Sequence, residues 1–323
     1  MTNNYLQISE LSSVIGNISS QGVYKLLKTK NLESILISAR KKVVPPLSIR
    51  TILLDKGFKY KKQILSFDMI KGGVGKTTLS SNVGMRASHY GCKTLLIDFD
   101  LQGNLSRSFN IDIDKNSKVW IDILKDNVAI KDTIVKIDDY LDIIPSNLNN
   151  SRLDIEMQHA SINIKDHVHD ILDSVINDYE LIIIDCPPAI NKVSASAICA
   201  SDTIIIPLNP DPYAMDGLEM TLNEIKRIKT NFKINRPNHL VVWNKYDARK
   251  RLGAIYMNEL AKQIPTENIL PVVIRTDTNY QNSIANTGSI FENTKNSVAK
   301  EDIDQMTREL IGITSWVEDN FTD

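Results

Sequence analysis

The residues best suited to chemistry form the glycine-rich run Lys71-Gly72-Gly73-Val74-Gly75-Lys76-Thr77-Thr78. An apolar run over residues 64–67 precedes it and a helical pattern through residue 85 follows, which is the layout of a phosphate-binding loop. Glycines there let backbone N–H groups approach an anion at the positive end of a helix. The Lys76 ammonium can neutralise the β- and γ-phosphates, and the Thr77 hydroxyl can hold Mg²⁺. The run therefore predicts a site for a nucleoside triphosphate and Mg²⁺. The predicted ligands of the nucleotide are Gly72, Gly73, Val74, Gly75, Lys76, Thr77 and Thr78.

Two apolar runs further along the chain end in carboxylates. Residues 94–97 lead into Asp98 and Asp100, and residues 181–184 lead into Asp185. The carboxyl ends of parallel strands meet at the edge where such sheets bind ligands, so we expect these acids near the glycine-rich run. Taken alone, acids after a strand can be ordinary turn residues. Their order after the phosphate-binding run favours a functional role, with Thr77 and Asp185 as ligands of Mg²⁺. The resemblance described next implies that Asp98 supports the same metal site.

Three boxes together resemble the ParA/MinD family of P-loop ATPases, over roughly residues 63–300. They are the glycine-rich run with Ile70 in place of the usual glycine and the additional Lys71, then Asp98-Phe99-Asp100-Leu101-Gln102-Gly103-Asn104, then Asp185-Cys186-Pro187-Pro188. The resemblance implies a homodimer that encloses two ATP molecules, in which Lys71 reaches the partner's nucleotide. It implies that Lys76 and Asp100 act in catalysis, Asp100 by positioning the attacking water. Leu101 stands where the family usually has proline, which makes that role of Asp100 less secure.

A fourth box bears on the base of the nucleotide. Residues 240–243 predict a strand that ends in Asn244-Lys245-Tyr246-Asp247, which fits the sequence with which GTPases recognise guanine. Asn244 and Asp247 are therefore candidate ligands of the base. The resemblance to ParA proteins favours adenine, hence ATP and ADP, and GTP remains the alternative.

The first 62 residues are basic, with 11 Lys and Arg against 3 Asp and Glu, whereas the remainder has 27 against 36. A short helix from about Ser9, a break at Gly16 and a second helix capped by Ser19 or Ser20 predict a helix-turn-helix. Its second helix would face inward through Val23, Tyr24 and Leu27. The predicted DNA contacts are Ser20, Gln21 and Lys25, with Arg40, Lys41 and Lys42 as a basic wing. A helical dimerisation arm, or merely a solvated basic surface, is the alternative.

The segment resembles the winged helix-turn-helix module of larger plasmid ParA proteins. In the same family a late strand and loop carry basic residues that hold DNA without sequence preference. Arg275 is the best-matched position for that role, and Lys295 and Lys300 are weaker candidates. Such binding acts through phosphates and falls steeply with salt.

Composition is ordinary for a globular protein, with 42% hydrophobic and 24% charged residues over 323 residues. We expect an α/β fold with a mostly parallel twisted sheet flanked by helices, as in P-loop NTPases, preceded by a small helical helix-turn-helix domain. The predicted domains are 1–62 and 63–323. Cys92, Cys186 and Cys199 form no CxxC pair and predict reduced thiols. A single helix is expected over residues 297–316, and the acidic tail after it argues against a membrane-binding helix.

The function that these residues and the resemblance favour is ATP-driven partitioning of a plasmid or chromosome. The expected protein is cytoplasmic and nucleoid-associated, binds DNA, and is stimulated by a ParB-type centromere-binding protein. A nucleotide-switched repressor of its own operon is the alternative, and both roles can coexist. A membrane-cycling regulator of the MinD type is disfavoured by the acidic tail.

Overall fold

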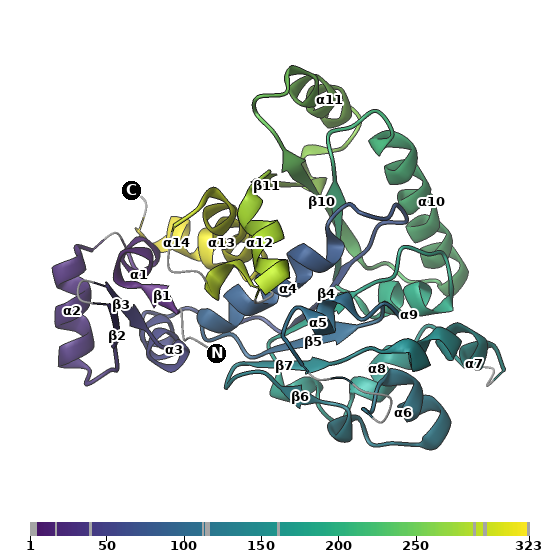
Figure 1. Cartoon of the computed structure of the whole chain (residues 1–323), viewed down its shortest axis with the longest axis horizontal. Helices are drawn as coiled ribbons and strands as arrows, with labels where there is room; N and C mark the ends of the chain where they lie inside the picture. Colours follow the sequence, from purple (N-terminus) through teal and green to yellow (C-terminus); the bar gives the residue numbers. More distant parts are fainter. Residues whose placement is uncertain are drawn as a thin grey trace.

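An eight-stranded sheet forms the centre of the protein in the computed structural model (Figure 1). The structure describes residues 5–16, 18–38, 41–111, 113, 117–159, 162–286, 289–292 and 296–321. The strand order is β11-β10-β9-β4-β8-β5-β7-β6, and every neighbouring pair is parallel except β6 with β7. The strands are β4 (Gln63–Phe67), β5 (Thr94–Asp98), β6 (Val135–Lys136), β7 (Leu141–Ile144), β8 (Leu181–Asp185), β9 (Thr203–Leu208), β10 (Asn238–Tyr246) and β11 (Ile269–Arg275). The predicted α/β fold with a mostly parallel sheet is confirmed.

Both faces of this sheet are buried, which is why its strands read as continuous apolar runs rather than as an alternation. In β8, Leu181 and Ile183 pack into one hydrophobic cluster, while Ile182 and Ile184 pack into another on the opposite face. The covering helices are α4 (Lys76–His89), α5 (Asn104–Arg107), α6 (Trp120–Asp126), α7 (Leu153–His159), α8 (His167–Leu172), α9 (Lys192–Ala200), α10 (Ala214–Phe232), α11 (Arg251–Ala261), α12 (Thr278–Asn286), α13 (Val298–Leu310) and α14 (Ile313–Phe321). No helix in the described ranges is long and apolar enough to cross a bilayer.

The N-terminal segment contains three short helices and a small three-stranded sheet of its own. Its elements are β1 (Leu6–Gln7), α1 (Ile8–Val14), α2 (Ser20–Thr29), β2 (Ile35–Ser38), β3 (Lys41–Val44) and α3 (Pro46–Asp55). Ser19 caps α2 by accepting a hydrogen bond from the N–H of Gly22. Strands β2 and β3 form an antiparallel hairpin, and β1 pairs with the other edge of β3. Lys41 and Lys42 of the expected basic wing lie in β3, and Arg40 lies outside the described residues.

Tyr24 is the one residue of the expected inner face of α2 that does not lie inward. Val23 and Leu27 are buried, whereas Tyr24 is 41% exposed. The Lys42 ammonium lies over its ring, 5.4 Å from the centroid. A tyrosine ring can satisfy its hydroxyl in water while its face attracts a cation, and the sequence pattern did not distinguish this from burial.

The N-terminal segment shares a hydrophobic cluster with α4, α13 and the large sheet. A buried ion cluster lies at the same junction. The guanidinium of Arg86, in the helix that follows the phosphate-binding loop, is 1% exposed and pairs with Glu10 of α1 and Asp304 of α13. Helix α4 is therefore in direct contact with both the N-terminal segment and the C-terminal helices, which lie side by side in Figure 1.

Two helical predictions are corrected. The single C-terminal helix is two helices, because Gly312 adopts a φ of +80° that ends α13. The helical period of the apolar residues over 164–176 predicts one helix there, but α8 is shorter, because the Asn163 side chain accepts from the N–H of Lys165 and closes a local turn. Helices α11 and α12 were not predicted. Lys295 lies outside the described residues.

Candidate nucleotide-binding site

The glycine-rich run forms a loop between β4 and α4. Gly73 and Gly75 have φ values of +74° and +99°, which other residues adopt only with strain. A Cβ on Gly75 would collide with the side-chain amide of Asn244. Helix α4 begins at Lys76, so its first N–H groups face the loop. The cradle predicted from the sequence is thus present, and its tight backbone is the reason for the glycines.

Lys76 lies inside this loop. Its side chain is 7% exposed, and its ammonium donates a hydrogen bond to the carbonyl oxygen of Met69 at 2.9 Å. Asp68, directly before Met69, is also buried. Burial raises the pKa of Asp68 to about 7 against the opposing effect of the Lys76 charge. The sequence reasoning missed Asp68, although its place immediately before the run was a possible signal.

Thr77 and two buried carboxylates form the acidic side of the site. The Thr77 hydroxyl donates to Oδ2 of Asp185 at 2.6 Å. Asp185 and Asp98 are paired positions of the adjacent strands β8 and β5, and neither is exposed. Burial, with the neighbouring Asp98 charge second, raises the pKa of Asp185 to about 8. Burial likewise raises the pKa of Asp98 to about 7. The Lys76 charge opposes this rise at Asp185 but does not outweigh burial, so a further positive group would be needed to stabilise both carboxylates as anions.

These residues fit Mg²⁺. Oδ1 of Asp185 is buried and has no hydrogen-bond partner in the part of the chain that the structure describes. The described residues include no group of three or more His, Cys, Asp or Glu side chains that could hold a metal ion on their own. Mg²⁺ in nucleotide sites typically uses one or two carboxylates together with phosphate oxygens and water, so an incomplete protein set is what a shared site needs. Thr77 and Asp185 would hold the ion, and Asp98 lies beside them.

Asp98 also organises the loop 98–104, here named switch I. Its Oδ2 accepts hydrogen bonds from the N–H and the hydroxyl of Ser106, and its Oδ1 accepts from the N–H of Asp100. Asp100 itself is half-buried, and its carboxylate accepts from the N–H of Gln102 at 3.0 Å. The loop turns without a proline at Leu101. The sequence reasoning missed Ser106, which fixes the orientation of Asp98.

Lys71 forms an ion pair within its own chain. Its ammonium lies 2.9 and 3.1 Å from the two carboxylate oxygens of Asp211, and 5.9 Å from the ring centroid of Tyr213. Asp211 belongs to the turn that leads from β9 into α10. The two prolines around Asp211, Pro210 and Pro212, indicate a turn, but they give no reason to pair Asp211 with Lys71, because 140 residues separate the two.

The end of β10 supports the phosphate-binding loop from behind. Asn244 donates its amide to the carbonyl of Val74 at 2.6 Å, and Lys245 donates to the carbonyl of Gly73 at 2.5 Å. Asp247 is paired with Arg249 through both carboxylate oxygens, which lowers the pKa of Asp247 to about 2. Asn244 is therefore placed against the loop, and Asp247 faces a cation of its own chain.

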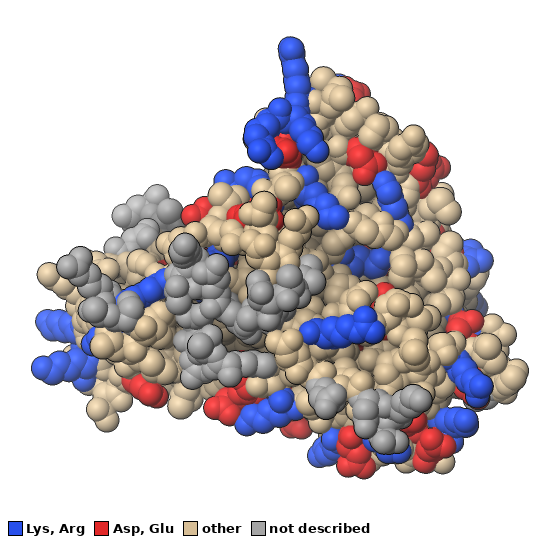
Figure 2. Space-filling model, in the orientation of Figure 1, with Lys and Arg blue, Asp and Glu red and all other residues tan. Residues whose placement is uncertain are grey.

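The predicted DNA-contacting residues lie in two separate places. Ser20, Gln21 and Lys25 are exposed on α2. Arg275, at the end of β11, pairs through its guanidinium with Asp302 of α13, at distances from 2.5 to 3.0 Å. Figure 2 shows Lys and Arg side chains both at the α2 end and around the loop before α11. The exposed basic residues there are Lys245 at the end of β10, Arg249 and Lys250 in the loop, and Arg251 at the start of α11.

Comparison with known proteins agrees with this geometry. A family profile described as an AAA domain matches residues 62–237. The virulence plasmid ParA family protein pGP5-D of Chlamydia psittaci is 32% identical over 251 residues, which cover 76% of this chain and 93% of that protein. The chain belongs to the ParA family. The sporulation initiation inhibitor protein Soj of Bacillus subtilis is also 32% identical, over 201 residues that cover 62% of this chain and 79% of Soj.

Solved structures show the same fold at lower identity. A putative plasmid partition protein of Borrelia burgdorferi bound to AMPPNP superimposes with a TM-score of 0.65 at 23% identity, covering 79% of this chain and all of that chain. The McdA–ATP complex of Cyanothece gives a TM-score of 0.70 at 20% identity, covering 79% of this chain and 98% of that chain. This ParA-family chain therefore has the P-loop NTPase fold of a nucleotide-binding ATPase family.

Proposed function

We propose that this protein hydrolyses ATP in a partition system, as a homodimer that binds DNA when it holds ATP. The observation that carries the proposal is the arrangement of Thr77 and Asp185, with an unsatisfied carboxylate oxygen, directly beside the phosphate-binding loop. The names of its relatives, a plasmid ParA family protein and Soj, supply the biological context.

The residues divide the work of phosphoryl transfer. The loop N–H groups and Lys76 bind and neutralise the phosphates, and Asp100 orients the attacking water. Bound Mg²⁺ would supply further neutralisation of charge on the β- and γ-phosphates. Lys71 would leave Asp211 and reach the nucleotide of the partner subunit. Positioning and electrostatic stabilisation account for most of the rate in reactions of this type.

ATP is the favoured nucleotide. A guanine-recognising Asp needs both carboxylate oxygens for the base, and in this chain Arg249 occupies both oxygens of Asp247. Turnover measured with ATP and GTP at equal concentrations tests this, and faster turnover of GTP would overturn it. Asn244 and Asp247 remain proposed to lie near the base.

The site assignment is tested with Lys76→Ala, using the exposed Lys125→Ala as a matched control. We expect Lys76→Ala to lose turnover by at least about 100-fold, because it removes a charge that acts on the transferring phosphate. The control should keep the wild-type rate. Normal turnover by Lys76→Ala would refute the assignment.

Dimer formation is tested with turnover blocked. Asp100→Ala should sediment as a dimer with ATP and Mg²⁺, and the further change Lys71→Ala should return it to a monomer. A monomer in both cases would remove the basis for the proposed cycle. A ParB-type partner is expected to accelerate turnover only in proteins that form the dimer.

A second function, repression of its own operon, is favoured by the exposed Ser20, Gln21 and Lys25 on a capped helix beside a hairpin. Nuclease footprinting separates the two roles. A discrete footprint that depends on residues 1–62 would support repression, whereas uniform coating with ATP would support the partition role alone. Arg275→Ala should weaken only the uniform coating, and by a factor that shrinks as salt rises.

A further inference from the structure

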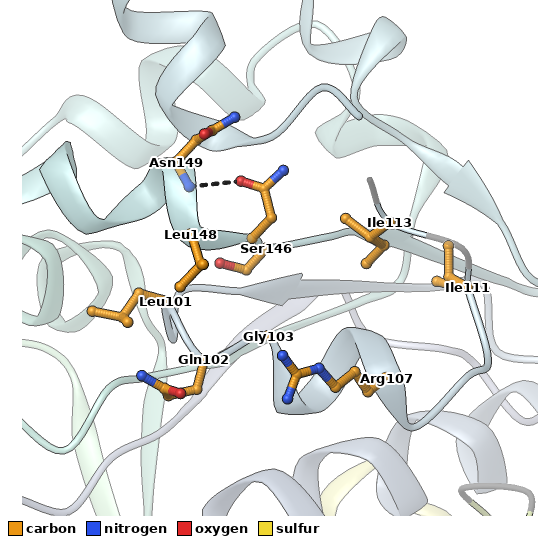
Figure 3. Close-up of a pocket in the computed structure, with 10 residues that line it drawn as sticks. Leu101, Gln102, Gly103, Arg107, Ile111, Ile113, Ser146, Leu148 and Asn149 are labelled. Atoms are coloured by element: carbon orange, nitrogen blue, oxygen red, sulfur yellow. Dashed lines mark hydrogen bonds between the residues drawn. The ribbon is translucent and has the colours of Figure 1, made fainter. Parts of the chain in front are cut away.

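A cavity of about 360 Å³ lies beside switch I (Figure 3). Its walls come from switch I, from the residues after α5 and from the turn that follows β7, residues 146–149. In Figure 3, Leu101 and Leu148 lie at one side of it, and Ile111 and Ile113 at the other. No residue of the phosphate-binding loop lines it, so it is separate from the nucleotide site.

The lining combines an apolar surface with one cation. Four aliphatic side chains contribute to it, and one of them, Leu148, is 70% exposed and so available to a ligand. Arg107 is the one charged group among the lining residues that the structure describes. Its guanidinium forms no hydrogen bond or ion pair with them, although most other arginines of the described chain are paired with acids.

A chain of hydrogen bonds connects the cavity wall to the acidic side of the nucleotide site. The N–H of Ser146 donates to the Ser106 hydroxyl at 2.9 Å, and that hydroxyl donates to Asp98 at 2.6 Å. The backbone of switch I also touches this wall, because a Cβ on Gly103 would lie 2.8 Å from the carbonyl oxygen of Ser146. A change in the position of residues 146–149 would therefore change the hydrogen bond to Ser106 and the backbone contact with Gly103, and so displace switch I.

We propose that this cavity binds a small amphipathic organic anion, and that its occupancy changes the nucleotide affinity through switch I. The anionic group pairs with Arg107, and the apolar body contacts Leu101, Leu148 and the two isoleucines. The volume is at the lower end of the range for small-molecule sites, so the ligand has the size of a short-chain carboxylate rather than of a nucleotide. The proposal does not depend on ATP hydrolysis.

Hexanoate is the probe, with hexan-1-ol and inorganic phosphate as the two partial probes. Titration calorimetry on the full chain should give a dissociation constant on the order of 1 mM for hexanoate, as expected for a ligand of this size. Hexan-1-ol and phosphate should each bind at least about tenfold more weakly. Hexan-1-ol lacks the anionic group that pairs with Arg107, and phosphate lacks the apolar body. Equal binding of phosphate would mean a simple anion site and would overturn the amphipathic assignment.

Three substitutions locate the binding. Arg107→Gln should reduce hexanoate to the affinity of hexan-1-ol, whereas Arg107→Lys should keep most of it. Leu148→Ser should weaken hexanoate and hexan-1-ol alike, and the exposure of Leu148 means that the fold should tolerate the change. The matched control is Arg152→Gln, an exposed arginine close in sequence that does not line the cavity. Wild-type affinity in Arg107→Gln and Leu148→Ser, or no binding of hexanoate at all, would refute the site.

The coupling to switch I has its own readout. The dissociation constant of a fluorescent ATP analogue should change at least about threefold when hexanoate is saturating, and hexanoate affinity must change by the same factor when the analogue is saturating. Arg107→Gln should abolish both changes without altering the affinity for the analogue alone. Unchanged nucleotide affinity in the wild-type protein would refute the coupling. If the protein binds hexanoate but hydrolyses no ATP, the cavity site is supported and the proposed function is refuted.

Discussion

The Lys71 ammonium is held by both carboxylate oxygens of Asp211 in the same chain, at 2.9 and 3.1 Å. Both side chains are about one-third exposed. Lys71 is thus engaged within its own subunit, and in the proposed dimer, where it acts on the partner's nucleotide, it would first have to give up this ion pair. Formation of the proposed dimer then includes the loss of a partly exposed ion pair, an interaction typically worth up to about 1 kcal/mol.

Asp211→Asn should therefore favour the dimer. We expect the dimer dissociation constant with ATP and Mg²⁺ to fall by a factor of about 2 to 5, since 1 kcal/mol corresponds to about fivefold. Sedimentation of the turnover-blocked Asp100→Ala protein, with and without Asp211→Asn, measures this. Glu219→Gln, which removes an exposed acid from α10, the helix that follows Asp211, is the matched control. Equal or weaker dimerisation in Asp211→Asn would show that the ion pair does not restrain Lys71.

A second prediction concerns the support of the phosphate-binding loop by β10. Asn244→Ala removes the amide that holds the Val74 carbonyl and leaves space against Gly75. The loop should lose its fixed geometry, and the affinity for ATP should fall about tenfold, equivalent to the 1 to 1.5 kcal/mol of one buried hydrogen bond. Asn238→Ala, at the exposed start of the same strand, is the control. Nucleotide titration by fluorescence measures both, and equal affinities would contradict this role.

A third prediction follows from a buried histidine. His167 accepts a hydrogen bond at Nε2 from the indole N–H of Trp120 at 3.3 Å, which requires a neutral imidazole. Burial lowers the pKa of His167 to about 4. Between pH 6.5 and 4 the unfolded chain therefore binds a proton that the folded chain excludes, so the free energy of unfolding falls as the pH falls through this window.

The size of this effect is up to about 3 kcal/mol, because each pKa unit is worth about 1.4 kcal/mol. Urea unfolding at pH 7 and pH 5 measures it in wild-type protein and in His167→Gln, which cannot be protonated. The variant should lose less stability between the two pH values. His169→Gln, two residues away, is the control. The same pH dependence in wild type and His167→Gln would show that His167 does not titrate on unfolding.

The sequence predicted those parts of the site that depend on neighbouring residues. The glycines, Lys76 and Thr77 lie on one turn, and Asp98 and Asp185 end apolar strands, so a local pattern was sufficient to find them. Asp211 and Ser106 were missed because their roles arise from contacts across the fold. The contact between the Asn244 amide and the phosphate-binding loop was missed for the same reason, because the two are about 170 residues apart in the sequence.

The secondary structure was likewise predictable only where neighbouring residues determine it. Strand positions were predictable because a sheet buried on both faces needs continuous apolar runs. The break between α13 and α14 at Gly312 was missed because a glycine inside an apolar period is compatible with either outcome until its φ is known. Tyr24 was placed inward by its spacing, whereas Lys42 from the hairpin makes its exposed position favourable.

The last prediction concerns the two buried acids beside the phosphate-binding loop, Asp98 and Asp185. Oδ1 of Asp185 is unsatisfied among the described residues, and burial beside Asp98 raises the pKa of Asp185 to about 8. The folded protein then binds more protons than the unfolded chain between about pH 4 and pH 8, so in the absence of Mg²⁺ the free energy of unfolding should fall as the pH rises through this range. Asp185→Asn should reduce this slope and raise the melting temperature in EDTA at pH 8, because an amide is less costly to bury than a carboxylate.

The same substitution should abolish the stabilisation that ATP and Mg²⁺ give to the wild-type protein. Thermal unfolding in EDTA and in ATP with Mg²⁺ measures both effects, with the exposed Asp178→Asn as the control. A lower melting temperature of Asp185→Asn in EDTA, or full stabilisation by ATP and Mg²⁺, would mean that this carboxylate is structural rather than reserved for the metal.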